Sequence, residues 1–250
     1  MSEEITISKS KFWKYATLLL VVAIIIVFFL KYESNGSNSD SGNSGGSSDS
    51  NAQKVVISDS VKKIKTIAGA EQAFIENKVI SAIVVCSYDT LETIEKIYAV
   101  VEAKMQYISG YMFYREGPAL IEAFNKLENK PDVLILNGNG ILHPRRIGMA
   151  SHAGILLDIP TIGIAKSLMI GEKKGDTIYV DKEARGYELT TREHANPIYI
   201  SPGHKVSLKT SFEIIKHSIK LPHKLPEPLH LAHAYANKVK SELSDQGDAV

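Results

Sequence analysis

The sequence predicts an α/β domain built on a mixed β-sheet flanked by helices and preceded by one transmembrane helix. An uninterrupted apolar run extends from Ala16 to Leu30, and residues 34–51 then contain only Ser, Gly, Asn and Asp. Beyond them, short apolar runs come first as strands and later alternate with helical patterns. This order of elements indicates a mixed sheet covered by helices.

Residues 12–32 have the composition of a membrane-spanning helix. With its aromatic flanks the apolar run reaches about 21 residues, enough to cross the hydrocarbon core. No small-residue cleavage site follows, so we favour a retained anchor over a cleaved signal peptide. The basic residues before the run outnumber those just after it, which predicts a cytoplasmic amino terminus and a domain outside. They are Lys9, Lys11 and Lys14 before it and Lys31 after it.

Composition divides the chain into five segments. The Ser/Gly/Asn/Asp stretch cannot bury a core and is typical of a flexible linker. We therefore expect a short amino-terminal segment, a transmembrane helix, a linker, one globular domain and a disordered tail. Their respective ranges are 1–11, 12–32, 33–52, 53–240 and 241–250.

Charge and cysteine content exclude some classes of protein. The net charge of +1 indicates that any basic, nucleic-acid-binding surface has to be local. The single cysteine, Cys86, excludes an internal disulfide framework and a cysteine-rich zinc site.

The first elements of the domain are predicted to be strands. Apolar runs at Ile67 to Phe74 and Val79 to Ser87 are separated by three polar residues, a pattern typical of a β-hairpin. Residues 91–101 are interpreted as a third strand rather than a helix.

Helices and strands alternate in the second half. Helical spacing predicts helices at 118–128 and 148–157, and Pro118 suits a first helical turn. Thr210 and Glu213 have the spacing of a capping box, and a last helix contains Leu231, Tyr235 and Val239. Short strands are expected at 133–136, 161–165 and 197–200.

Several polar residues in apolar surroundings have two possible interpretations. Glu71 lies inside the first strand, where a carboxylate is either solvated or held for a metal or proton transfer. Glu116 lies near a helix amino terminus, where the macrodipole alone can favour it. Arg145 and Arg146 form either a phosphate clamp or a solvated basic corner.

The order of the short motifs along the chain is more specific than any one of them. The motifs include Ile67-Ala68-Gly69-Ala70-Glu71, Arg115-Glu116-Gly117-Pro118, Gly138-Asn139-Gly140, His143-Pro144-Arg145-Arg146, Ile164-Ala165-Lys166 and Pro226-Glu227-Pro228. Over roughly residues 66–238 this succession closely resembles endonuclease V.

The resemblance implies a ribonuclease H-like fold and a phosphodiester-cleaving enzyme. Such enzymes act near deaminated bases, especially inosine, in DNA or RNA and use Mg²⁺ or Mn²⁺. Carboxylates hold the cation, which activates water and stabilises the leaving oxygen. The implied partner is therefore single-stranded or deaminated nucleic acid, and the chain is expected to be a monomer attached to a membrane through residues 12–32.

The resemblance also assigns roles residue by residue. Glu71, Glu116, Asn137 and His233 would hold the metal, and the first three would act in catalysis with His143 and Lys166. Tyr107 corresponds to the wedge beside the extruded base, although both flanking prolines of the family pattern are absent here. The remaining substrate contacts would come from Gly138, Gly140, Arg145 and Arg146.

Two of the metal positions depart from the family. Glu71 and Asn137 stand where the family has aspartate, so one ligand is longer and one has lost its negative charge. Displacement of a ligand by about 1 Å can cost on the order of 100-fold in rate. The alternative interpretation is thus a catalytically impaired nucleic-acid-binding or interaction module on the same fold.

Overall fold

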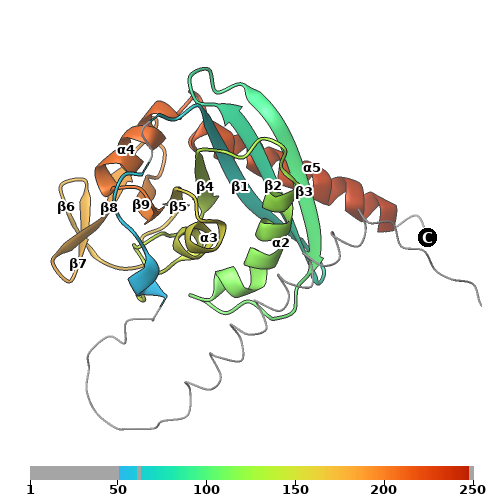
Figure 1. Ribbon diagram of the computed structural model, residues 1–250, viewed down its shortest axis with the longest axis horizontal. Coiled ribbons are helices and arrows are strands. Elements are labelled where there is room, and N and C mark those ends of the chain that lie inside the picture. The colour runs from blue at the N-terminus through green and yellow to red at the C-terminus, as the bar shows by residue number, and fades with distance from the viewer. Residues whose placement is uncertain (1–50, 61–62, 248–250) are drawn as a thin grey trace, which may run out of the picture. The chain divides into compact units, whose positions relative to one another are not determined.

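The computed structural model describes residues 51–60 and 63–247. A nine-stranded sheet lies at the centre of this part of the chain (Figure 1). The strand order is β3-β2-β1-β4-β5-β9-β8-β7-β6. Parallel and antiparallel neighbours both occur, and helices lie on both faces. The predicted mixed sheet with flanking helices is therefore confirmed.

The first three strands form an antiparallel meander. They are β1 (Thr66–Ile75), β2 (Lys78–Ser87) and β3 (Thr93–Glu102). β2 is buried along almost its whole length, as its continuous run of apolar residues requires. The predicted hairpin and third strand are confirmed.

Two parallel strands extend the sheet from β1. These are β4 (Val133–Asn137) and β5 (Thr161–Ala165), connected through α2 (Met112–Lys126) and α3 (Met149–Leu157). Ala70 of β1 pairs with Leu136 of β4, so the next residues, Glu71 and Asn137, are neighbours at the end of this pairing. The register thus brings two polar side chains together from positions far apart in sequence.

An antiparallel extension completes the other side of the sheet. β9 (Ile198–His204) pairs with β5, and β8 (Glu183–Leu189), β7 (Thr177–Val180) and β6 (Glu172–Lys174) follow outward. The sequence predicted part of β9 but none of the other three strands. All of β6 is exposed, so it has no apolar pattern to detect.

The helices cover the sheet in two pairs. α2 and α3 pack on one face, against buried residues such as Ala68, Leu134 and Leu136. α4 (Leu208–His217) and α5 (Glu227–Gly247) pack on the other, where Ile67 and Ile135 belong to the core. Adjacent strand residues enter opposite cores, as the period of two demands.

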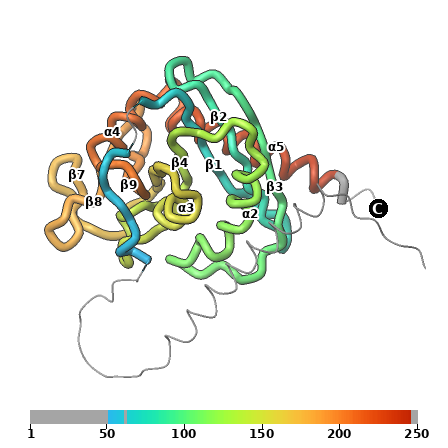
Figure 2. Tube along the Cα trace, viewed as in Figure 1, coloured from blue at the N-terminus to red at the C-terminus, as the bar shows by residue number. Residues whose placement is uncertain are grey.

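The segment before β1 is attached to β9. A short 3-10 helix, Ala52–Lys54, begins the described chain, and the backbone of Val56 bonds with both His204 and Lys205. Figure 2 shows this segment, in blue, running beside β9.

Three predicted boundaries need correction. α2 begins at Met112, so Pro118 lies inside the helix rather than in its first turn. Ser207, not Thr210, caps α4, because its side chain accepts the backbone N–H of Thr210. α5 continues through residues 241–247, so much of the tail predicted to be disordered is helical.

The prediction of a transmembrane helix before the fold is also corrected. Across residues 51–60 and 63–247, none of the helices has both the length and the apolar character needed to cross a bilayer. The segment 12–32 lies outside the described residues, as does most of the predicted linker 33–52. The described residues therefore give no support to the predicted membrane attachment or to the predicted outward orientation of the domain.

Candidate active site

Glu71 and Asn137 contact each other where parallel β1 and β4 end their pairing. The Asn137 Nδ2 donates a hydrogen bond of 2.7 Å to the Glu71 Oε1. Glu71 is buried, with 4% of its surface exposed. A carboxylate in such a place has to be compensated by hydrogen bonds or by positive charge.

His233 approaches the same carboxylate oxygen from α5. Its Nδ1 lies 3.6 Å from the Glu71 Oε1. The helix can come this close because β1 carries Gly69, where a Cβ would stand 2.3 Å from the Pro228 carbonyl carbon. The contact between strand and helix therefore depends on the missing side chain.

Glu116 adds a second buried acid from α2. Only 4% of its surface is exposed. Burial raises the pKa of Glu116 to about 7; the neighbouring Arg115 acts in the opposite direction, and the negative charge of Glu71 adds to the increase. The two carboxylates are thus close enough to influence each other electrostatically.

The cluster has the donors for a cation but is not preassembled. Across the described residues, no three His, Cys, Asp or Glu side chains already converge as a metal site. The Glu71 Oε2, however, is buried without a hydrogen-bond partner in this part of the chain. Together with buried Glu116, this orphaned oxygen fits a divalent cation that would satisfy it.

A pocket lies between the loop before α2 and the glycine turn after β4, and this turn begins with Gly138, the residue that follows Asn137. Its lining includes Tyr107, Tyr111, Gly138, His143 and Met169. Gly138 has φ +134°, which lets the turn bend toward the pocket wall. Tyr107 is 58% exposed, so its ring is available to a ligand.

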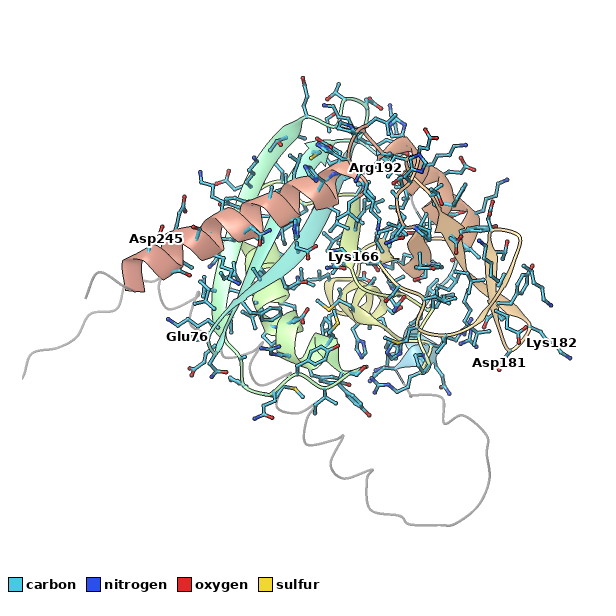
Figure 3. All side chains as sticks on the ribbon, turned by 180° about the vertical axis from the view of Figure 1, so that it is seen from behind. Glu76, Lys166, Asp181, Lys182, Arg192 and Asp245 are labelled. Atoms are coloured by element: carbon cyan, nitrogen blue, oxygen red, sulfur yellow. The ribbon has the colours of Figure 1, made fainter. Side chains whose placement is uncertain are left out.

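The arginine and lysine residues predicted for the site have different surroundings in the structure. Arg145 donates to the Gly110 carbonyl and stacks its guanidinium over the Tyr111 ring, 4.0 Å from the centroid. Arg146 forms an ion pair with Glu183 of β8. Lys166 follows β5 and is exposed, as Figure 3 shows near the middle of the molecule. Both arginines are therefore held by contacts within the protein, whereas Lys166 is exposed to solvent.

Comparison of the sequence with models of known families identifies the family of this chain. A sequence model of the family described as Endonuclease V matches residues 49–234 of this chain. The chain belongs to the endonuclease V family.

Curated endonuclease V proteins resemble the chain over most of their length. The protein of Dictyoglomus thermophilum is 40% identical over 206 residues, which span 77% of this chain and 90% of the relative. The protein of Haloarcula marismortui is 38% identical over 200 residues, or 70% of this chain and 73% of the relative.

Solved endonuclease V structures share the fold. The Bacillus subtilis structure has a TM-score of 0.72 and 32% identity, covering 78% of this chain and 90% of the other. The Ciona intestinalis structure, in complex with DNA containing an inosine followed by a ribo-adenosine, has a TM-score of 0.70 and 27% identity. It covers 77% of this chain and 94% of the other.

The residues that the endonuclease V resemblance indicated fall into three groups in the structure. Glu71, Asn137 and His233 meet directly, with Glu116 close by. Tyr107, Gly138 and His143 line the pocket, whereas the Gly140 N–H is held by Ser201. The remaining three, Lys166, Arg145 and Arg146, lie outside these two sets of contacts, in the positions described above.

Two further contacts belong to this endonuclease V site, and sequence reasoning missed the second of them. His152 of α3 stacks on Phe113 at 4.9 Å between centroids, on the pocket wall. Asn237 contacts His233 one helical turn away, with 3.1 Å between the Nδ2 and the Nε2. The spacing of four residues between His233 and Asn237 was the available signal for the second contact.

Proposed function

We propose that this chain is an endonuclease that hydrolyses phosphodiesters near deaminated bases, inosine above all, in DNA or RNA, with the help of a divalent cation. The observation that carries the proposal is the meeting of Glu71, Asn137 and His233, with an aromatic-lined pocket that starts at the residue after Asn137. Membership of the endonuclease V family and the inosine-containing DNA bound by the Ciona relative support it.

The residues that would hold the cation are Glu71, Glu116, Asn137 and His233. The unsatisfied Glu71 Oε2 and the buried Glu116 are the groups that gain most from a positive charge. When bound, a divalent cation lowers the pKa of a coordinated water and stabilises the negative charge that develops on the phosphate.

Side chains around the cluster orient the substrate. Exposed Lys166 binds a phosphate oxygen and offsets its charge. Exposed Tyr107 stacks in the place of an extruded base, while the pocket receives that base. His143 lines the same pocket and contacts the substrate backbone from there. Arg145 keeps the loop at Gly110 and Tyr111 in position for this task.

A nicking assay on inosine-containing DNA and RNA, with Mg²⁺ or Mn²⁺, tests this function. Cleavage should require the inosine and the cation and should be lost on Glu116→Gln. The matched control is Glu122→Gln on the same helix, whose side chain is 40% exposed and pairs with Lys126. The proposal fails if the unmodified chain cuts no faster than Glu116→Gln.

One observation favours a second candidate, a nucleic-acid-binding module that does not cleave. The Asn137 amide already donates a hydrogen bond to the Glu71 Oε1, and an amide contributes no negative charge to a cation site. In this case binding would be salt-sensitive and independent of metal. Asn137→Asp would then create cleavage that the unmodified chain lacks.

A further inference from the structure

We infer that this site selects a divalent transition-metal ion of the Mn²⁺ type over Mg²⁺. The inference rests on the proposed cation-dependent function and concerns which cation the side chains of this chain prefer. It follows from the chemistry of the donors that meet at Glu71, namely a neutral amide and an imidazole beside the carboxylates.

The first argument is charge. Mg²⁺ is a hard cation that binds through carboxylates and water and loses its own water reluctantly. Of the groups that would hold the cation, Glu71 and Glu116 supply the negative charge, and Asn137 supplies none. A site with few charges disfavours Mg²⁺ more than a cation that also forms stable bonds to neutral donors.

The second argument is the nitrogen donor. The His233 Nδ1 faces the Glu71 Oε1 at 3.6 Å, so the ring already points toward the cluster. Imidazole is a common ligand for transition metals, whereas oxygen donors suit Mg²⁺. A single nitrogen ligand therefore favours Mn²⁺ over Mg²⁺ at this position.

Asn237 is the positioning residue for that nitrogen. Its carboxamide lies 3.1 Å from the His233 Nε2, on the side of the ring away from Glu71. If the carboxamide oxygen accepts an N–H from Nε2, the lone pair of Nδ1 is directed at the cluster. In the structure the Asn237 Nδ2 faces the Nε2, and a half-turn of the carboxamide would present its oxygen instead and leave the Nδ1 lone pair for a cation.

Asn137 would also have to turn for its oxygen to hold a cation. In the metal-free arrangement its Nδ2 donates to the Glu71 Oε1. Rotation of the carboxamide replaces this donor by the Oδ1, which can ligate the cation together with the released carboxylate. The site therefore opens by breaking one hydrogen bond rather than by moving the backbone.

Direct binding to the full chain tests the preference without an activity measurement. Mn²⁺ binding is followed by electron paramagnetic resonance, Mg²⁺ binding by competition with Mn²⁺, and both by thermal unfolding. We expect Mn²⁺ to bind at least about tenfold more tightly than Mg²⁺ and to raise the Tm at correspondingly lower concentration.

Three variants assign the preference to residues. His233→Asp replaces nitrogen by a charged oxygen, and Asn137→Asp adds a carboxylate, so each should strengthen Mg²⁺ binding and narrow the preference. Asn237→Ala should weaken Mn²⁺ binding by about tenfold and leave Mg²⁺ nearly unchanged. Ser241→Ala, at an exposed position of the same helix, is the matched control and should change neither.

The outcomes separate this inference from the proposed function. If Mg²⁺ binds as tightly as Mn²⁺, or if His233→Asp leaves the preference undiminished, the selectivity inference is wrong while cation-dependent cleavage stands. If neither cation binds the unmodified chain, the cation-dependent function fails together with the inference.

Discussion

At the scale of single residues, the buried position of Glu116 disfavours ionisation of its carboxyl group. Its burial raises its pKa to about 7, so the folded protein is destabilised whenever this carboxylate is charged and no cation is present. We predict that Glu116→Gln, which keeps the shape and removes the charge, stabilises the metal-free protein at about pH 8 by about 1–3 kcal/mol. Urea unfolding in the presence of a chelator measures the difference.

The same substitution at Glu122 provides the reference. Glu122 is exposed and forms a surface ion pair with Lys126 at 3.0 Å. Glu122→Gln should alter the free energy of unfolding by no more than about 0.5 kcal/mol. A destabilised Glu116→Gln protein would show that burial of the charge is not what governs this position.

His204 is a second residue whose charge is disfavoured by folding. Burial lowers its pKa below the ordinary 6.5, Lys205 lowers it further, and Asp158 opposes them. Because the folded-state pKa is the lower one, His204 contributes stability above pH 6.5 that is lost as the pH falls through the folded-state value.

We therefore predict that His204→Asn makes stability less dependent on pH below this point. Asn can still accept the Val56 N–H that the His204 Nδ1 now accepts at 3.2 Å. Unfolding by urea across about pH 5 to 8 measures the effect. His194→Asn, at an exposed turn residue with φ +59°, should leave the pH profile unchanged; an equal flattening in both variants would contradict the assignment.

At the scale of elements, the junction of β1 with α5 decides whether the site assembles. A Cβ at Gly69 would meet the backbone of Pro228 at 2.3 Å, which only a shift of the helix can relieve. We predict that Gly69→Ala costs roughly 3 kcal/mol of stability and weakens cation binding, because α5 carries His233. Thermal unfolding and Mn²⁺ titration measure the two effects.

The control for Gly69→Ala is Gly175→Ala. At Gly175 an added Cβ meets nothing within 4 Å, and φ is +61°. Its cost should therefore be the backbone strain alone, about 1 kcal/mol. Unchanged Mn²⁺ binding by Gly69→Ala would show that the helix position is not critical to the site.

How much of the fold the sequence could predict depended on apolar patterning. β2 and β5 were recognised because their residues are buried and apolar. The start of α2 was missed because its N-cap, Tyr111, provides no side-chain hydrogen bond and leaves no capping signal. β6 was missed because pairing of its backbone, and not burial of its side chains, holds it.

The candidate site could also be predicted only in part. Glu71, Asn137 and His233 were indicated by motif order, yet their contact depends on strand register and on the approach of α5, which are tertiary properties. The roles of Arg145 and Arg146 were harder to predict, because their partners Gly110 and Glu183 are distant in sequence.

At the scale of the whole molecule, the net charge of +1 leaves little long-range attraction for nucleic acid. Binding should depend on a few local cations, of which Lys166 lies near the middle of the face in Figure 3 and Lys182 at its outer edge. Log affinity falls with log salt, and the steepness of this fall reports the number of phosphate contacts. We predict that Lys166→Gln makes the fall less steep by about one phosphate contact, whereas Lys182→Gln does not.

Fluorescence anisotropy of an inosine-containing oligonucleotide between about 50 and 200 mM salt measures the slope. An equal decrease for both lysines would indicate general attraction rather than a defined contact at Lys166.

The distance along the chain between Glu71 and His233 has a consequence for biosynthesis. The first strand of the sheet is made early, but its acid meets its histidine partner only when α5 has docked. In a nascent polypeptide still attached to the ribosome, Glu71 is therefore in place before its histidine partner on α5 can reach it.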